Sequence, residues 1–202
     1  VTVNKGNSTG MVNGVVAGYV TIKNCTTDTT VNATNDVFLV AGICGYAGGD
    51  ATIDIIGCSS NLKASGKIEI ASGVVGCQGF GANTFNIKNC KANVNVTSTT
   101  STALSGIFSG YDNGDTDIST INIDHCIVEG TLKAEGSYVS GLSSGLFASS
   151  ATKKIEINSD GFIAYNLKAE SAHGLSYSMN LAYGTDGTGL NSGIYTLKRN
   201  QN

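Results

Sequence analysis

The chain has 202 residues, a formal net charge of −3 and only 13% charged residues, and it lacks both Pro and Trp. No basic cluster is longer than Lys153-Lys154, which argues against a nucleic-acid partner and against binding to an anionic membrane surface. No run of 18 apolar residues is present, so no membrane span is expected.

Five segments with the same apolar spacing recur along the chain. They end at residues 25, 58, 90, 126 and 160, and therefore repeat every 32 to 36 residues. Each segment has two apolar residues separated by one polar residue, as in V20-T-I-K-N-C25 and F85-N-I-K-N-C90. This alternation is typical of a β-strand with one buried and one exposed face. Recurrence at this length predicts a solenoid, in which each unit is buried against its neighbours.

The apolar residues of these segments predict a continuous core. We expect one apolar position of each segment and the Cys at its end to stack in successive coils, namely Ile22, Ile55, Ile87, Ile123, Ile157, Cys25, Cys58, Cys90 and Cys126. A second inward column should contain Val20, Ile53, Phe85, Ile121 and Ile155. The polar residues between the two columns should face outward as a row of Thr21, Asp54, Asn86, Asn122 and Glu156.

Two more strands are predicted in each unit, following the first in chain order. The second carries apolar pairs two residues apart, such as Leu62/Ala64 and Val94/Val96. The third ends in a small residue, a Gly and an apolar residue, as in A41-G-I43 and S72-G-V74. Three short strands per unit of about 33 residues predict an all-β fold, a right-handed parallel β-helix of about five coils. The period of two and the β-branched residues exclude a helical solenoid.

The repeat divides the chain into two parts. Residues 1–175 form the predicted β-helix domain, which starts in mid-coil because Val1 and Val3 fit the second strand of a preceding coil. Residues 176–202 lose the repeat and are predicted to be an irregular last coil or a C-terminal cap. No signal peptide is recognisable at Val1, and we interpret the chain as a piece of a longer protein. Its N-terminal edge is expected to stack on further coils of the parent chain or on a neighbouring subunit.

The six cysteines fit more than one interpretation. Four of them hold the equivalent position in four units, where stacking would place them about 4.8 Å apart with parallel side chains. This favours a buried, reduced column in which Cys acts as a small hydrophobic residue. Zinc would need converging ligands rather than a row, and His125 beside Cys126 should face outward. Disulfides in an oxidising location are the other alternative, and Cys44 and Cys77 lie in a different strand.

Candidate sites are few. Asp112, Asp115 and Asp117 lie in the longest interval between segments and could supply oxygen ligands to calcium. A solvated Asn-Gly turn is the favoured interpretation of this segment, so no metal and no cofactor are predicted. Polysaccharide cleavage would need acids clustered beside a basic residue, yet the only Arg is Arg199, outside the repeat. Ice binding would need a flat face of Thr, which the acids of the outward row interrupt. Four N-x-[S/T] sequons, at Asn7, Asn24, Asn32 and Asn95, are as many as chance gives.

The tetrapeptides G42-I-C-G45 and G73-V-V-G76, each followed by a turn and a strand of the repeat, resemble the GLUG motif. The copies G106-I-F-S109 and G141-L-S-S144 lose the second Gly. The resemblance covers about residues 10–175. It implies a large surface or secreted protein, in some cases adhesin-like and in others associated with immunoglobulin-cleaving peptidases. The repeat itself carries no catalytic residues.

These observations predict a non-enzymatic structural or adhesive segment of a larger protein, extracellular or at the cell surface. Host or matrix glycans or proteins are its candidate partners. One alternative is a β-helix that binds or cleaves carbohydrate, which an outward cleft with aromatic residues beside paired acids would indicate. A second alternative is a subunit of a self-assembling filament.

Overall fold

The computed structural model describes residues 2–3, 6–15, 18–47, 50–76, 83–101, 103–113, 118–135, 138–148, 153–171, 176–177, 181–182 and 193–200. All regular secondary structure in these residues is β. The candidate residues Asp115, Asp117 and Cys77 lie outside the described residues, as does Val1.

The strands form three parallel sheets. Sheet C contains six strands, β4 (Gly18–Lys23), β7 (Ala51–Ile56), β10 (Thr84–Lys88), β14 (Ile118–Asp124), β18 (Lys153–Asp160) and β22 (Gly193–Asn200). Sheet B also contains six, β3 (Val12–Val15), β6 (Cys44–Ala47), β9 (Val75–Gly76), β13 (Phe108–Asn113), β17 (Ser143–Ala148) and β21 (Leu181–Ala182).

Sheet A has ten strands because it supplies two segments of every coil. Its first half contains β1 (Thr2–Val3), β11 (Lys91–Ser98), β15 (Ile127–Ala134) and β19 (Ile163–Ser171). Its second half contains β2 (Gly6–Thr9), β12 (Ala103–Ser105), β16 (Tyr138–Ser140) and β20 (Ser176–Tyr177). The long strands β5 (Thr26–Ala41) and β8 (Ser59–Ser72) run through both halves.

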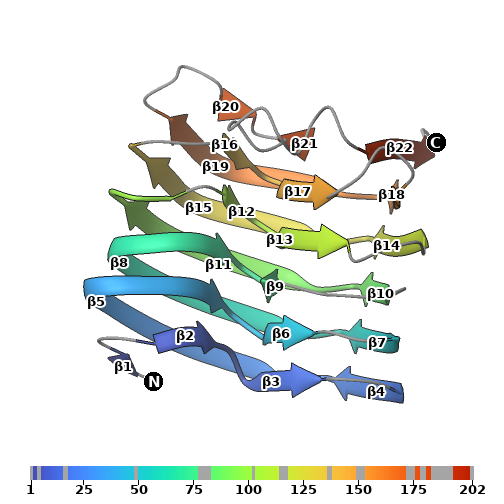
Figure 1. The fold of residues 1–202 in the computed structure, drawn as a ribbon, viewed down its shortest axis with the longest axis horizontal. Helices are drawn as coiled ribbons and strands as arrows, with labels where there is room; N and C mark the ends of the chain where they lie inside the picture. Colours follow the sequence, from blue (N-terminus) through green and yellow to red (C-terminus); the bar gives the residue numbers. More distant parts are fainter. Residues whose placement is uncertain are drawn as a thin grey trace.

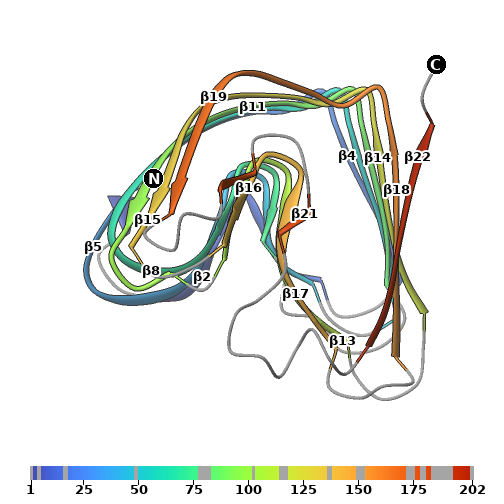
Figure 2. The same cartoon turned by 90° about the horizontal axis from the view of Figure 1, so that it is seen from above.

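Successive coils stack in the order of the chain (Figure 1). Seen along the stack, sheet A folds back on itself to form one arm of the cross-section, and sheets B and C enclose the other arm (Figure 2). With the C-terminal coil toward the viewer, the chain runs counterclockwise from sheet C through sheet A to sheet B, so the solenoid is right-handed (Figure 2). The predicted right-handed parallel β-helix is therefore confirmed.

Two details of the prediction differ from the structure. Each coil contains a fourth segment, the short strand of sheet B that follows the Gly-apolar pair, and two of the sheets have six strands where about five coils were expected. The sequence pattern does not predict sheet B as a separate sheet, because β9 is only two residues long and shows no alternation of its own.

The register of the fifth repeat segment also differs. Ile157 lies opposite Ile121 instead of Ile123, and Asn158, not Glu156, lies opposite Asn122. Placing Ile157 in the column of Ile123 was therefore wrong by two residues. Two residues are one full period of a strand, so the alternation of Ile155 and Ile157 fits both registers equally well.

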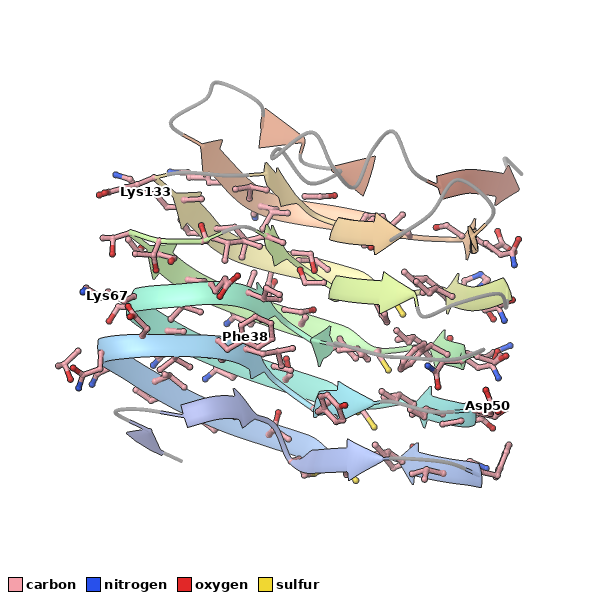
Figure 3. The ribbon with its side chains drawn as sticks, viewed as in Figure 1. Phe38, Asp50, Lys67 and Lys133 are labelled. Carbon is pink, nitrogen blue, oxygen red and sulfur yellow. The ribbon has the colours of Figure 1, made fainter. Side chains whose placement is uncertain are left out.

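The core fills both arms of the cross-section. Ile22, Ile55, Ile87 and Ile123 are buried and in register, as the alternation predicts. Phe85 of sheet C and Phe108 of sheet B meet edge to face across the interior, with ring centroids 5.0 Å apart. Outward side chains include Lys67 and Lys133 at one end of the cross-section and Asp50 at the other (Figure 3).

The corner from sheet C to sheet A uses one left-handed residue per coil. The positions are Asn24, Gly57, Asn89, His125 and Gly161, with φ of 52°, 62°, 52°, 49° and 58°. Gly adopts this conformation freely, and Asn and His tolerate it better than most side chains do. This explains why Asn, Gly and His alternate immediately before the Cys positions.

The Gly of the Gly-apolar pair is required for a different reason, which is close packing between coils. A Cβ built on Gly73 would lie 2.2 Å from the carbonyl oxygen of Gly106, and one on Gly106 would lie 2.3 Å from that of Gly141. Coils can therefore stack at this corner only if no side chain is present.

Candidate binding surfaces

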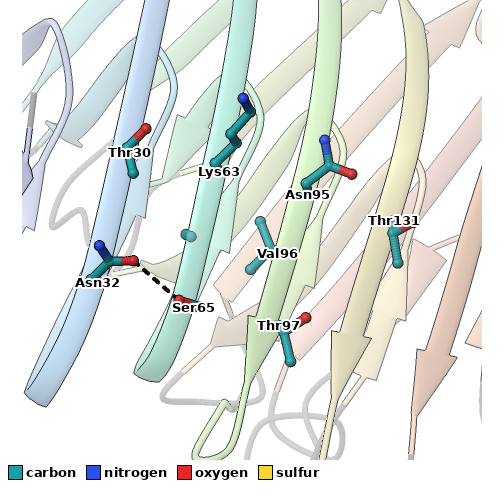
Figure 4. A pocket seen from close by; sticks show the side chains of 9 residues that line it. Thr30, Asn32, Lys63, Ser65, Asn95, Val96, Thr97 and Thr131 are labelled. Atoms are coloured by element: carbon teal, nitrogen blue, oxygen red, sulfur yellow. Dashed lines mark hydrogen bonds between the residues drawn. The ribbon is translucent and has the colours of Figure 1, made fainter.

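The outer face of the first half of sheet A forms a shallow groove between outward polar side chains. Its volume is about 330 Å³, and it crosses β5, β8, β11 and β15. The outward side chains that line it are Thr30, Asn32, Lys63, Ser65, Asn95, Thr97 and Thr131 (Figure 4). Thr30, Lys63, Asn95 and Thr131 lie in one row across the strands, because the register pairs each with the next. Within this groove Ser65 donates a hydrogen bond of 3.3 Å to Asn32 Oδ1.

This face can make many hydrogen bonds but carries little charge. Alternate residues of the same strands, such as Val31, Ala64 and Val96, are buried in the core, so the outward side chains stand on a rigid backbone. Thr, Asn and Ser supply both donors and acceptors, and Lys63 supplies a cation. The apolar spacing that identifies the strands of sheet C gives no comparable signal for this face.

The outward row of sheet C is instead a chain of side-chain hydrogen bonds. Asn86 donates to Asp54 Oδ1, Asn122 to Asn86 Oδ1 and Asn158 to Asn122 Oδ1, each at 2.7 Å. The hydroxyl of Tyr19 donates to the other oxygen of Asp54. Most of these polar groups therefore satisfy one another along the stack, which makes the row a structural element and a poor acid–base site.

The four Cys of the repeat segments lie at equivalent positions, because the residues on either side of them are in register. All four are free; Cys58, Cys90 and Cys126 are buried, and Cys25 is half-buried. The thiols of Cys90 and Cys126 donate to the carbonyl oxygens of Ile55 and Ile87 at 3.4 and 3.5 Å. Each inner thiol thus bonds back to the sheet C strand of the preceding coil.

Hydrogen bonding and burial both shift the thiol pKa values. The hydrogen bond between the thiols of Cys90 and Cys126 lowers the pKa of Cys90 and raises the pKa of Cys126. Burial raises the pKa of Cys58, and it raises the pKa of Cys44 in sheet B to about 11.

One cluster in the described residues has metal-ligating groups. Asp124, His125 and Asp160 place their potential ligand atoms within 4.8 Å of one another. Lys88 already forms an ion pair of 2.7 Å with Asp124, and His125 Nδ1 contacts the same carboxylate. The hydrogen bonds from Lys88 and His125 lower the pKa of Asp124. His125 is exposed, as the alternation predicts, and its left-handed backbone accounts for its position without a metal.

The calcium candidate lies largely outside the described residues. The backbone of Asp112 belongs to strand β13 and pairs with Phe147 of β17. The side chain of Asp112, and the whole of Asp115 and Asp117, are outside the described residues. No ligand geometry can therefore be assigned to this segment.

A second, smaller cleft lies where sheet A folds back. Its volume is about 310 Å³, and its lining residues are Asp36, Val37, Phe38, Lys67, Glu69 and Thr100. It brings an aromatic ring close to two carboxylates on the outside of the solenoid. This combination is the one expected of a carbohydrate-binding β-helix. It is not recognisable in the sequence, because its residues lie about 30 positions apart in successive coils.

Among the described residues there is no helix long and apolar enough to cross a membrane. Comparison with known proteins adds no relative, since no family model, curated protein or solved structure matches the chain.

Proposed function

We propose that the chain is a non-enzymatic structural and adhesive segment of a larger protein, located outside the cell or at its surface. Its role is to continue a β-solenoid and to present the polar face of sheet A to a partner. The observation that carries this proposal is the difference in burial between the first coil and the coils stacked on it.

Two apolar side chains in and next to edge strand β4 are less covered than their equivalents in the next coil, although Ile22 of the same strand is buried. Val20 and Cys25 are half-buried, whereas Ile53 and Cys58 at the same positions of the next coil are 0% and 1% exposed. Two of the three large exposed apolar side chains of the described residues, Met11 at 44% and Tyr19 at 67%, also belong to this coil. The edge strands β3 and β4 each pair with one neighbour in sheets B and C. An unpaired parallel edge above apolar side chains favours the addition of another β-layer.

The experiment tests this layer-on-layer contact directly. In sedimentation velocity over a concentration series, the chain is expected to self-associate through the first coil when no other layer is supplied. Replacing Met11 and Tyr19 with Lys should weaken this association at least about tenfold, because charges at an edge oppose strand addition. Ile127→Lys is the matched control, since Ile127 is the third exposed apolar residue, at 37%, and lies in an inner coil.

Two outcomes would contradict the proposal. One is a monomer at millimolar concentration whose β4 amides exchange with solvent as slowly as those of β7. The other is association that Ile127→Lys weakens as much as the double variant does. Long filaments in electron micrographs would instead favour the self-assembling subunit.

The adhesive half of the proposal rests on the groove of sheet A. A face of Thr, Asn and Ser suits a partner surface rich in hydrogen-bonding groups, such as a matrix glycan or glycoprotein. Binding to an immobilised matrix glycoprotein should fall in the Asn95→Ala/Thr131→Ala variant and persist in Lys91→Ala, which changes β11 outside the groove. Equal loss in both variants would remove this face from the proposal.

The Gly residues of the motif support the same structural role. The Gly-apolar pairs that resemble the GLUG motif fall at the corner where no Cβ fits between coils, as at Gly42 and Gly73. The resemblance to GLUG-repeat surface proteins stays part of the proposal. Carbohydrate binding is the second candidate function, and the cleft at the fold-back of sheet A favours it.

A further inference from the structure

The fold-back of sheet A changes between the second and third coils. Strands β5 and β8 pass through it without interruption, whereas the third coil ends β11 at Ser98 and begins β12 at Ala103. A short bend at residues 99–101 is therefore placed against a corner that the two preceding strands span. The cleft of about 310 Å³ lies at this change, lined by both long strands and by Thr100 of the bend.

Hydrogen bonds hold the bend against β8. The hydroxyl of Ser98 accepts from the backbone N–H groups of Ile68 and Thr100, each at 3.3 Å, and donates to the carbonyl of Ile68. The backbone N–H of Thr99 donates to the carbonyl of Gly66 at 3.0 Å. The wall that carries Thr100 is therefore fixed before any ligand arrives, which reduces the entropy lost on binding.

Adjacent strands supply the remaining groups side by side. The register pairs Val37 with Ile68 and Leu39 with Ile70, so Phe38 lies opposite Glu69. These four flanking residues are all buried, so Phe38 and Glu69 point outward from a fixed backbone, and both are half-buried. Beside them Lys67 Nζ lies 3.9 Å from Asp36 Oδ1, and both side chains are largely exposed.

We propose that this cleft binds one residue of a neutral saccharide, with Phe38 under the apolar face of the sugar ring and polar groups around its rim. The carboxylates of Asp36 and Glu69 accept hydrogen bonds from sugar hydroxyls, and Lys67 and Thr100 donate to them. A volume near the lower end of ligand sites, roughly 300–1,000 Å³, fits a single ring better than an extended chain.

The charges around the cleft define which saccharide fits. Two carboxylates and one ammonium leave an excess of negative charge, which opposes uronic acids and sialic acids. Partial burial, and then the charge of Asp36, raise the pKa of Glu69. A hydroxyl group of the sugar can replace some of the hydration that Glu69 loses, whereas an anionic sugar would raise its pKa further.

This inference rests on carbohydrate binding, the second candidate function above, and assigns to it a site and a class of sugar. The cleft lies away from the edge strands β3 and β4. Failure of saccharide binding leaves the self-association experiment unaffected, and the converse also holds.

Saturation-transfer NMR and titration with a panel of neutral, uronic-acid-containing and amino-substituted oligosaccharides test the proposal. We expect millimolar binding of at least one neutral saccharide and no saturable binding of the acidic ones. Phe38→Ala should weaken binding about tenfold or more by removing the stacking surface. Glu69→Gln should weaken it less, because the amide keeps one acceptor oxygen.

Ile127→Ala is the matched control, since Ile127 is an exposed apolar residue of β15 that does not line the cleft, and this variant should not affect binding. If Phe38→Ala loses the native circular dichroism spectrum, Thr100→Val at the exposed wall serves in its place and should also weaken binding. The absence of saturable binding of any neutral saccharide at about 10 mM overturns the proposal. Equal binding by the Phe38 and Ile127 variants, or a preference for alkylammonium ions, overturns it as well.

Discussion

Two corners of the solenoid behave in opposite ways. The corner from sheet C to sheet A is built alike in five coils, with one left-handed residue followed by a buried or half-buried Cys or Phe. The fold-back of sheet A varies, because β5 and β8 run through it while the next three coils break there into separate strands. The first corner thus keeps one backbone geometry from coil to coil, whereas the fold-back changes between coils and forms a cleft.

The regular stacking of the coils can be disrupted in the buried Ile column of sheet C. Ile87 is 1% exposed between Ile55 and Ile123, so Ile87→Asp would bury an unpaired charge. We expect a loss of at least about 4 kcal/mol in the free energy of unfolding, with unfolding of the neighbouring coils. Urea denaturation followed by circular dichroism measures it. Ile87→Val, which removes one methylene, should cost only about 1 kcal/mol, and a similar cost for both variants would contradict the buried position.

The close packing at the Gly corner should give the next largest effect. Gly73→Ala places a methyl group 2.2 Å from a backbone oxygen and 2.7 Å from the side chain of Ala92. Overpacking of this kind costs about 1–3 kcal/mol. Gly18→Ala is the comparison, because its φ of +92° is strained but no atom lies within 4 Å of the added carbon. Thermal unfolding should show the larger loss for Gly73→Ala, and the reverse order would mean that the coils can separate at this corner.

The left-handed corner should respond to the shape of the side chain. Asn89 has φ of 52°, so Asn89→Val should cost about 2 kcal/mol, while Asn89→Gly should be neutral or stabilising. Asn95→Val is the matched control, since Asn95 lies in the regular strand β11 and Val suits a strand. Chemical denaturation of the three variants checks the order. Equal stability of the Val and Gly variants at residue 89 would show that the corner relaxes.

The sequence was sufficient for the fold because the strands of sheet C carry their own pattern. Within one strand, Ile53 and Ile55 are separated by the polar residue Asp54, and this alternation defines one inward and one outward face. The recurrence of the pattern then predicts that the strands stack. The register of β18 was not determined, because the alternation of Ile155 and Ile157 fits both Ile121 and Ile123. The positions that would have resolved it are Asn158, which continues the amide row, and Gly161, which continues the left-handed corner.

The candidate sites depend on neighbours in other coils, which a single strand does not reveal. Phe38 and Glu69 are 31 residues apart in sequence and become neighbours only through the exact pairing of β5 with β8. The same holds for the groove, where Lys63 and Asn95 meet across two strands. Aligning all outward positions, and not only those of the strongest segment, would have suggested both.

The variable corner gives the smallest and most local effect, which concerns Glu69. Its pKa is raised by partial burial and by the charge of Asp36, so the folded state binds this proton more tightly than the unfolded state does. Stability from this carboxyl is therefore fully present below its unfolded pKa and is lost as the pH rises through its folded pKa. Carboxyl NMR titration should show a raised pKa for Glu69 in the native protein and a smaller shift in Asp36→Asn.

Glu69→Gln removes the charge, so it should stabilise the protein slightly at pH 7 and not at pH 3. Glu129→Gln is the control: it should not stabilise the protein at pH 7, because it removes the ion pair between Glu129 and Lys91. The expected gain is small because Glu69 remains partly exposed and solvent screens the repulsion. If Glu69 titrated at its ordinary value and Asp36→Asn left it unchanged, the two carboxyls would not share one environment. The fold-back would then be a simple solvated bend. Its contrast with the corner from sheet C to sheet A would be one of backbone shape alone.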